Sequence, residues 1–320
     1  MNRAHPAHEL PLSISWIPRR SGVLKRACGW ILLINCTVVT LADENLMQAR
    51  ELLTLPQPAP DHRHAYGEEP SQFGELYLPT RKNPGQNFPV VVLVHGGCWQ
   101  AQWGLDHLRH LADQLRGQGY AAWNLEYRKL GQPGGGWPGS CADIDQGVDA
   151  LAEISTRFAL DLDRVVVVGH SAGGHLALWL ACDRANRSVE LPAAKVQLRG
   201  AIGLAPITDL LGAAAAECCG TAAADFLSVD PSRRAEIDPL ASPIHRLPAK
   251  VPLRLLHGAE DDVVPLAQSE DFAQRAAESG SDCRFETIAG IGHYEQVAAR
   301  GPAWEQLLAT LKELLPPTTP

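Results

Sequence analysis

From about residue 88 to residue 315, short apolar runs alternate with longer amphipathic segments. Phe88–Val94 (FPVVVLV) is a continuous apolar run rich in valine, which predicts a parallel strand that is buried on both faces. Similar runs predict further strands at Gly119–Leu125, Arg164–Val168, Gly200–Leu204, Val251–Leu256 and Cys283–Ile288.

The segments between these strands have helical periodicity. In Cys141–Phe158, for example, Ile144, Val148, Leu151 and Ile154 follow one another at spacings of three and four residues. The predicted helices are Leu105–Arg116, Cys141–Phe158, Ala172–Ala181, Leu266–Ser279 and Pro302–Leu315. This alternation predicts an α/β fold with a mostly parallel central sheet flanked by helices. Pro206–Arg246 is rich in alanine and proline and interrupts the alternation, so it predicts a small inserted loop or cap whose role the sequence leaves open.

The N-terminal region differs from this body. Four basic residues, Arg19, Arg20, Lys25 and Arg26, precede the uncharged run Ala27–Ala42, which is too short for a stable membrane span. Its pattern resembles a secretory signal. The long charged region and Thr40, two positions before Ala42, fit an amphipathic or disordered leader, or an over-extended start, equally well. The location therefore stays open between the cytoplasm and export. Residues 56–70 read as a linker, so we expect a leader and linker over 1–64 and the main α/β domain over 65–316.

Composition narrows the choice of partners. The 320 residues carry a net charge of −8, and no basic stripe suggests binding to nucleic acid. The eight cysteines form no CxxC pair, and we interpret Cys218 and Cys219 as ordinary small residues rather than a redox pair. We assign no cofactor and no metal site, since His62 and His64 have no acidic or thiol partner at ligand spacing.

The sequence Gly169–Gly173 (GHSAG) carries the clearest chemical signal. It fits the G-x-S-x-G pattern, and it lies between a predicted strand and a predicted helix, which is the context the pattern requires. In that context Ser171 sits on a tight turn, where the positive end of the following helix faces its oxygen. The sequence therefore predicts Ser171 as a nucleophile.

A serine hydroxyl needs a base within hydrogen-bond reach and a group that orients this base. His293, in the Gly290–His293 loop after the last predicted strand, is the candidate base. The orienting acid is expected after the Val251–Leu256 strand, where Glu260, Asp261 and Asp262 follow one another. Spacing alone leaves the choice among these three acids open.

The loop His95–Trp99 (HGGCW) follows the first strongly apolar strand. Its glycines leave backbone N–H groups uncovered, so Gly96, Gly97 and Cys98, together with the N–H of Ala172, are candidates for an oxyanion hole. We expect His95 to brace this loop by hydrogen bonding. Cys98 lacks a partnered base and is expected to line the site.

These motifs resemble the α/β-hydrolase superfamily over roughly Phe73–Leu315, and most closely its arylformamidase (kynurenine formamidase)-like and bacterial feruloyl-esterase-like branch. The H-G-G-x-W motif matches His95–Trp99, and the G-x-S-A-G-G-H elbow matches Gly169–His175. The resemblance implies an α/β-hydrolase fold and a serine-dependent hydrolase. Its H-G-x-x-D-x-x-V-P stretch places the catalytic acid on Asp261, with Asp262 as the fallback.

The substrate is constrained less strongly. Trp99 and Trp137 are candidates for an aromatic wall that binds a small-molecule ester or amide. We favour a carboxylic ester over an N-formylkynurenine-like formamide, because Pro206–Arg246 shows no feature that demands an anthranilate carboxylate. A prolyl or dipeptidyl peptidase and a non-catalytic binding protein on the same scaffold are also consistent with these motifs. The oligomeric state is left open.

Overall fold

The computed structural model describes residues 46–80, 85, 87–186 and 192–316. The signal-like run Ala27–Ala42 lies outside these residues, so the leader, and with it the limits 1–64 and 65–316, stays a prediction. Within the described ranges, no helix combines the length and the apolar character that crossing a bilayer requires.

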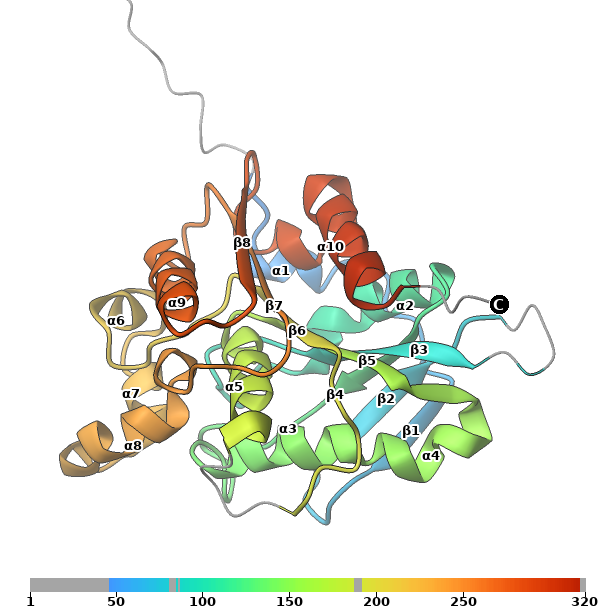
Figure 1. Cartoon of the computed structure of the whole chain (residues 1–320), viewed down its shortest axis with the longest axis horizontal. Helices are drawn as coiled ribbons and strands as arrows, with labels where there is room; N and C mark the ends of the chain where they lie inside the picture. The colour runs from blue at the N-terminus through green and yellow to red at the C-terminus, as the bar shows by residue number, and fades with distance from the viewer. Residues whose placement is uncertain (1–45, 81–84, 86, 187–191, 317–320) are drawn as a thin grey trace, which may run out of the picture. The chain divides into compact units, whose positions relative to one another are not determined.

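A single sheet runs through the described chain (Figure 1). Its strands lie in the order β1-β2-β4-β3-β5-β6-β7-β8. β1 and β2 are antiparallel to their neighbours, and the remaining pairs are parallel. The bounds are β1 His62–Ala65, β2 Phe73–Tyr77, β3 Phe88–Val94, β4 Ala121–Leu125, β5 Leu160–His170, β6 Gly200–Leu204, β7 Leu253–Gly258 and β8 Cys283–Ile288. The predicted α/β fold with a mostly parallel sheet is confirmed.

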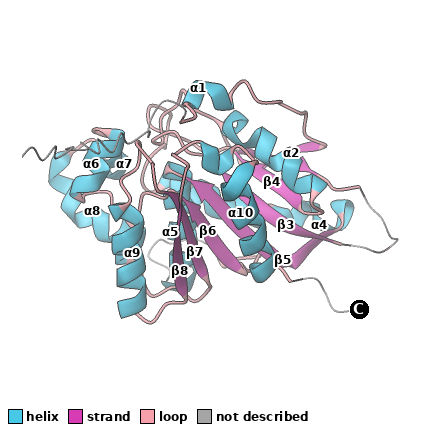
Figure 2. Cartoon of the chain, turned by 90° about the horizontal axis from the view of Figure 1, so that it is seen from above, coloured by secondary structure: helices cyan, strands magenta, loops and turns pink. Residues whose placement is uncertain are grey.

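The period-two geometry of a strand explains why the helices cover both faces. Along β3, Val90, Val92 and Val94 belong to one hydrophobic core, whereas Val91 and Leu93 belong to the other. Helices α3 (Gly139–Asp149), α4 (Leu151–Phe158), α5 (Ala172–Asn186) and α9 (Ala267–Glu278) build the first core. Helices α1 (Ala49–Leu52), α2 (Arg109–Gly117) and α10 (Gly301–Leu314) build the second (Figure 2).

Two local predictions need correction. The stretch 56–70 is not entirely a linker, because His62–Ala65 pair with Phe73–Tyr77 as an antiparallel edge of the sheet. Both strands are short and mixed in polarity, which hides them from a search for buried parallel strands. The helix expected at Cys141–Phe158 is divided at Ala150 into α3 and α4.

The inserted segment is a group of short helices. It contains α6 (Ala213–Cys219), α7 (Ala222–Leu227), η2 (Pro231–Arg233), α8 (Arg234–Ala241) and η3 (Pro243–His245). Figure 1 shows α6, α7 and α8 grouped together at the end of the sheet that carries β7 and β8. Pro206–Arg246 therefore forms a helical cap rather than a bare loop.

The strand order places the reactive loops together. β3 lies between β4 and β5. After β3 the chain therefore forms β4 on one side of β3 and then crosses over to form β5 on the other side. In open α/β sheets, ligands bind outside the carboxyl ends of the strands at such a switch point. The loop His95–Trp99 leaves β3 there, and Ser171 follows β5 at the same edge.

Candidate active site

Ser171 lies between the end of β5 and the start of α5. Its backbone has φ = +56°, a left-handed conformation that residues other than glycine rarely adopt. The Ser171 N–H donates to the carbonyl of Leu204 at 2.9 Å, which fixes the turn to the neighbouring β6. A strained backbone that the surroundings hold in place is typical of a functional position.

The flanking glycines make this turn possible. A Cβ on Gly169 would lie 2.0 Å from the carbonyl oxygen of Gly173, and a Cβ on Gly173 would lie 2.1 Å from the carbonyl oxygen of Val94. Since no side chain fits at either distance, both positions require glycine. β3, β5 and α5 approach each other closely around the serine for this reason.

The loop after β3 passes directly beside Ser171. A Cβ on Gly96 would lie 2.9 Å from the Cβ of Ser171. Gly97 and Cys98 have φ values of +104° and +49°, and their N–H groups donate to no residue of the described chain. Unpaired N–H groups beside a serine at a helix N-terminus are the donors that an oxyanion needs.

His293 is oriented by a buried carboxylate. Its Nδ1 lies 2.8 Å from Oδ2 of Asp261, and both side chains are almost completely buried. Oδ1 of the same carboxylate accepts from the N–H groups of Val263 and Val264 at 2.9 and 2.8 Å. The structure therefore joins His293 to Asp261, the acid that the resemblance implied.

Asp261 is held in its charged form. Burial raises the pKa of Asp261, but hydrogen bonds from His257 and His293 outweigh burial and hold this pKa well below its usual range. His257 is fully buried, and its Nε2 lies 3.2 Å from Oδ2 of Asp261. An ionised Asp261 can accept from Nδ1–H of His293, which leaves Nε2 of that ring free to act as a base.

The three consecutive acids have different surroundings. The Glu260 carboxylate accepts from the N–H groups of Gly290 and Ile291 at 2.8 and 3.1 Å, so it holds the backbone of the loop that carries His293. Asp262 is exposed. The contacts of Glu260 and His257 were not predicted, because Glu260 bonds to residues about 30 positions along the chain and His257 is buried within β7.

His170, the residue before Ser171, contacts both the ring and the backbone of His293. Its Nε2 donates to the carbonyl of His293 at 3.1 Å, and the two rings lie 4.4 Å apart. Burial and the adjacent His293 lower the pKa of His170 well below its usual value. His170 is therefore neutral near pH 7 and does not oppose a positive charge on His293.

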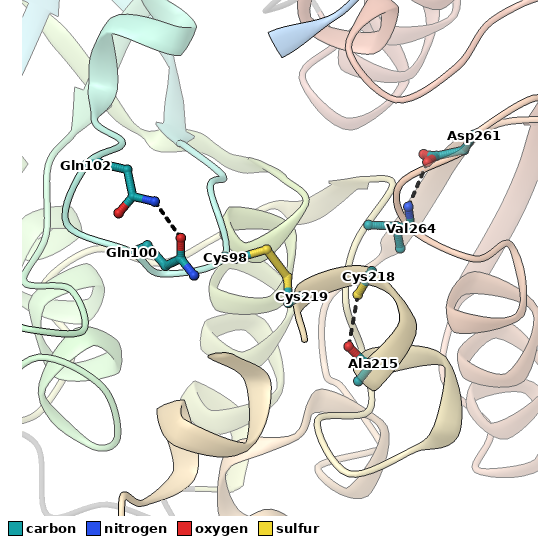
Figure 3. The surroundings of a disulfide bond; sticks show 8 residues. All are labelled: Cys98, Gln100, Gln102, Ala215, Cys218, Cys219, Asp261 and Val264. Atoms are coloured by element: carbon teal, nitrogen blue, oxygen red, sulfur yellow. Dashed lines mark hydrogen bonds between the residues drawn. A yellow bond between two sulfur atoms is a disulfide. The ribbon is translucent and has the colours of Figure 1, made fainter. Parts of the chain in front are cut away.

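A disulfide bond joins Cys98 in the loop after β3 to Cys219 at the end of α6 (Figure 3). The interpretation of Cys219 as an ordinary small residue is therefore wrong, and Cys98 has no free thiol. Cys218 remains free, and its thiol donates back to the carbonyl of Ala215 at 3.3 Å within the same helix. The disulfide connects the candidate oxyanion loop to the cap across 121 residues.

The two candidate substrate-binding tryptophans lie in different surroundings. Trp99 is fully buried and packs against His175 and Phe226, with ring centroids 5.2 and 4.9 Å away. Because Trp99 has no exposed surface, the prediction that it binds the substrate as part of an aromatic wall is wrong. Trp137 is only partly buried, and its ring lies 5.8 Å from that of Trp179.

One cluster of side chains has ligand types that could hold a cation. One ligand atom each of Asp209, Asp238 and His245 lies within 4.8 Å of the others. This cluster was not predicted from the sequence. His245 already pairs with Asp238 at 3.1 Å, and Ser242 donates to Asp238, so the cluster is satisfied internally. It belongs to the cap and the loop after β6, and it shares no residue with the Asp261–His293 pair.

The chain is similar in sequence to proteins that are named esterases. The model of the BD-FAE family matches residues 75–276. Esterase LipC of Mycobacterium tuberculosis is 28% identical over 244 residues, which cover 72% of this chain and 59% of that protein. Isoprenylcysteine alpha-carbonyl methylesterase ICME of Arabidopsis thaliana is 26% identical over 250 residues, covering 71% and 55%. The chain thus spans a little under three-fifths of the length of these relatives.

Solved structures show the same fold. Esterase B from Lactobacillus rhamnosis superposes with a TM-score of 0.67 at 21% identity, covering 82% of this chain and 89% of that chain. Esterase 2 of Thermogutta terrifontis gives a TM-score of 0.65 at 21% identity, covering 82% and 98%. The family match spans 202 of the 320 residues, from β2 through the serine elbow and the buried acid into α9. The chain therefore belongs to the BD-FAE family of α/β-hydrolases.

Proposed function

We propose that this chain hydrolyses carboxylic esters through an acyl-serine intermediate, with Ser171 as nucleophile, His293 as general base and Asp261 as the orienting acid. The observation that carries the proposal is the buried Asp261–His293 hydrogen bond at the same sheet edge as a serine in a left-handed turn. A binding protein on this scaffold has no need for these strained and buried groups together.

In the acylation step, Nε2 of His293 takes the proton of Ser171 while the serine oxygen attacks the ester carbonyl carbon. The carbonyl oxygen becomes an oxyanion, for which the N–H groups of Gly97, Cys98 and Ala172 are the candidate donors. When the tetrahedral intermediate collapses, the carbon–oxygen bond to the alcohol breaks. The imidazolium of His293 gives its proton to the leaving alcohol.

Deacylation repeats these steps with water as the nucleophile. His293 takes a proton from water, the resulting hydroxide attacks the acyl carbon, and the Ser171 oxygen leaves and takes the proton back. The products are a carboxylic acid and the free serine. Asp261 stays ionised throughout and stabilises the imidazolium that forms in each half of the cycle.

The relatives support an ester as the substrate. LipC is named an esterase, and ICME is named a methylesterase. One solved structure of esterase B from Lactobacillus rhamnosis was obtained with a tributyrin phosphonate inhibitor. We therefore propose a small carboxylic ester as the substrate, with a formamide as the main alternative.

The first experiment tests the nucleophile. The wild-type protein is expected to react with a fluorophosphonate probe at one site, which peptide mass spectrometry should assign to Ser171. Ser171→Ala should lose this labelling and hydrolysis of a p-nitrophenyl ester while its circular dichroism stays unchanged. Labelling that persists in Ser171→Ala, or a wild-type protein that is not labelled, would contradict the proposal.

A second measurement separates esters from formamides. The ratio of kcat/KM for short-chain and hydroxycinnamoyl esters to that for N-formylkynurenine is expected to exceed one. Both reactions proceed through the same triad, and pocket shape discriminates by only about 1–3 kcal/mol per methylene, so overlapping activity is expected. A hundredfold preference for the formamide would replace the ester in the proposal.

A further inference from the structure

Beneath the candidate oxyanion loop lies a buried charged network that the triad does not include. Nε2 of His95 lies 3.0 Å from Oε1 of Glu126, and Nδ1 of His95 lies 2.8 Å from the carbonyl oxygen of Gly96. Lys129 forms a close ion pair with Glu126. His95 is completely buried, and Lys129 and Glu126 are nearly so.

Every neighbour of the His95 ring nitrogens is an acceptor. The carbonyl oxygen of Gly96 has no proton to donate, so Nδ1 of His95 must donate to it. Glu126 is ionised, because Lys129 forms an ion pair with it and the backbone N–H groups of Tyr127 and Leu105 donate to its two oxygens. An ionised carboxylate also only accepts, so Nε2 of His95 must donate as well. A ring that donates from both nitrogens is an imidazolium.

The surroundings of Glu126 reinforce this assignment. Its Oε1 also accepts from the N–H of Tyr127 at 3.0 Å, and its Oε2 accepts from the N–H of Leu105 at 3.3 Å. A carboxylate that receives donors from several directions has no room for a proton of its own. Tyr127 adds a further contact that favours a cation, because its ring stacks on that of His95 with centroids 4.5 Å apart.

The bond from His95 to Gly96 also fixes the direction of one peptide group. In a trans peptide, the carbonyl of Gly96 and the N–H of Gly97 point in opposite directions. Because His95 holds the carbonyl, the N–H of Gly97 is held away from His95. Tyr127 anchors the same loop from the other side, since its hydroxyl donates to the carbonyl of His95 at 2.9 Å.

From this geometry we infer that Glu126 is a positioning residue: it holds His95 as an imidazolium, which fixes the Gly96–Gly97 peptide and supports the oxyanion with a buried positive charge. Glu126, His95 and Lys129 together carry a net charge of +1 beside a loop where negative charge develops. Their effect is larger in the transition state than in the bound substrate, because only the transition state carries the oxyanion. This inference rests on the proposed function of the loop.

Glu126→Gln tests the charge without removing the side chain. The amide keeps the size of the glutamate and can donate to Nε2, so His95 can become neutral and still bond to Gly96. We expect kcat to fall by about tenfold to a hundredfold, less than the roughly 100- to 1,000-fold loss on removing an oxyanion-hole donor. KM should change by no more than about twofold, because substrate binding does not use the charge.

Glu75→Gln is the matched control. Glu75 is also a buried carboxylate in an ion pair, with Arg109 at 2.9 Å, but it lies on β2 away from the loop. Glu75→Gln should therefore keep kcat, even if it lowers thermal stability. The affinity for benzeneboronic acid, which forms a tetrahedral anion on a serine, should weaken in Glu126→Gln in proportion to kcat and stay constant in Glu75→Gln.

A direct measurement needs no variant. ¹⁵N NMR of the wild-type protein with labelled histidine should show protons on both ring nitrogens of His95, assigned through its contact with the Tyr127 ring. A neutral His95 ring, or an unchanged kcat in Glu126→Gln, would overturn the inference. A wild-type protein that fluorophosphonate does not label would instead refute the proposed function. That result would not change the protonation state of His95 found by NMR.

Discussion

The disulfide between Cys98 and Cys219 provides the sharpest stability test, because it closes a long loop of the chain. The two cysteines are 121 residues apart. In the chain-entropy description of a cross-link, a loop of this length stabilises the folded state by about 5 kcal/mol at 25 °C. For a domain of this size the unfolding entropy is roughly 0.6 kcal/mol per kelvin, so the loss corresponds to a Tm decrease of about 8 °C.

The perturbation is the double variant Cys98→Ala/Cys219→Ala, followed by thermal unfolding under non-reducing conditions. Alanine has the same preference against positive φ as cysteine, so the backbone cost at Cys98 (φ = +49°) stays nearly constant. Cys218→Ala is the control, because it removes an adjacent sulfur that makes no cross-link. A dithiol reductant should lower the Tm of the wild-type protein and leave that of the double variant unchanged.

The same variant probes the oxyanion loop. Because Cys98 belongs to the candidate donors and Cys219 to the cap, cutting the link should lower kcat at 25 °C more than it raises KM. A displacement of about 1 Å at a reacting group can cost a hundredfold in rate. A double variant that melts within about 2 °C of the wild-type protein would refute the loop-closure reasoning.

Three further predictions address the site. Asp261→Asn should lower kcat by about 10⁴-fold in steady-state kinetics, because the amide no longer orients the imidazole, whereas Asp262→Asn should change kcat only slightly. The reverse ranking would move the catalytic acid by one residue. Gly96→Ala places a methyl group 2.9 Å from the Cβ of Ser171 and should lower kcat at least about tenfold. Gly117→Ala places its methyl group more than 4 Å from any atom outside the neighbouring helix backbone and should leave kcat unchanged, so equal kcat values in the two variants would contradict the close approach at Gly96. The pKa of Glu126 falls from 4.5 to about 2 on folding. The ionised Glu126 therefore stabilises the folded protein by about 3 kcal/mol above pH 4.5, and this contribution is lost as the pH falls toward 2. Urea unfolding of the wild-type protein and Glu126→Gln at pH 5 and pH 3 should show a difference that shrinks at the lower pH.

The central strands were predictable because their sequence carries the signal. β3 runs over Phe88–Val94 as expected, since a strand covered on both faces must be apolar throughout. The edge strand β1 and its neighbour β2 were not predicted, because their burial depends on neighbours that the sequence does not place. The α3–α4 division at Ala150 follows from local backbone geometry and leaves no composition signal.

The site was predictable only where a motif fixes local geometry. The serine elbow is formed by one local turn, so the glycines around Ser171 predict it from the sequence alone. The choice among three consecutive acids needed a family resemblance, because each could reach His293 by spacing alone. The partner of Cys98 was beyond prediction, since two cysteines 121 residues apart meet only once the cap has folded.

The arrangement of buried charge matches the separation of charge that ester hydrolysis creates. On one side, Asp261 stays ionised and faces the imidazole that becomes positive. On the other side, the inferred His95 imidazolium and Lys129 together outweigh the charge of Glu126 beside the candidate oxyanion loop. Both networks are buried, where charges act more strongly than in water and are already oriented before the reaction begins. A site built in this way stabilises the transition state more than the neutral substrate, and the two networks can be tested independently because they contain no common residue.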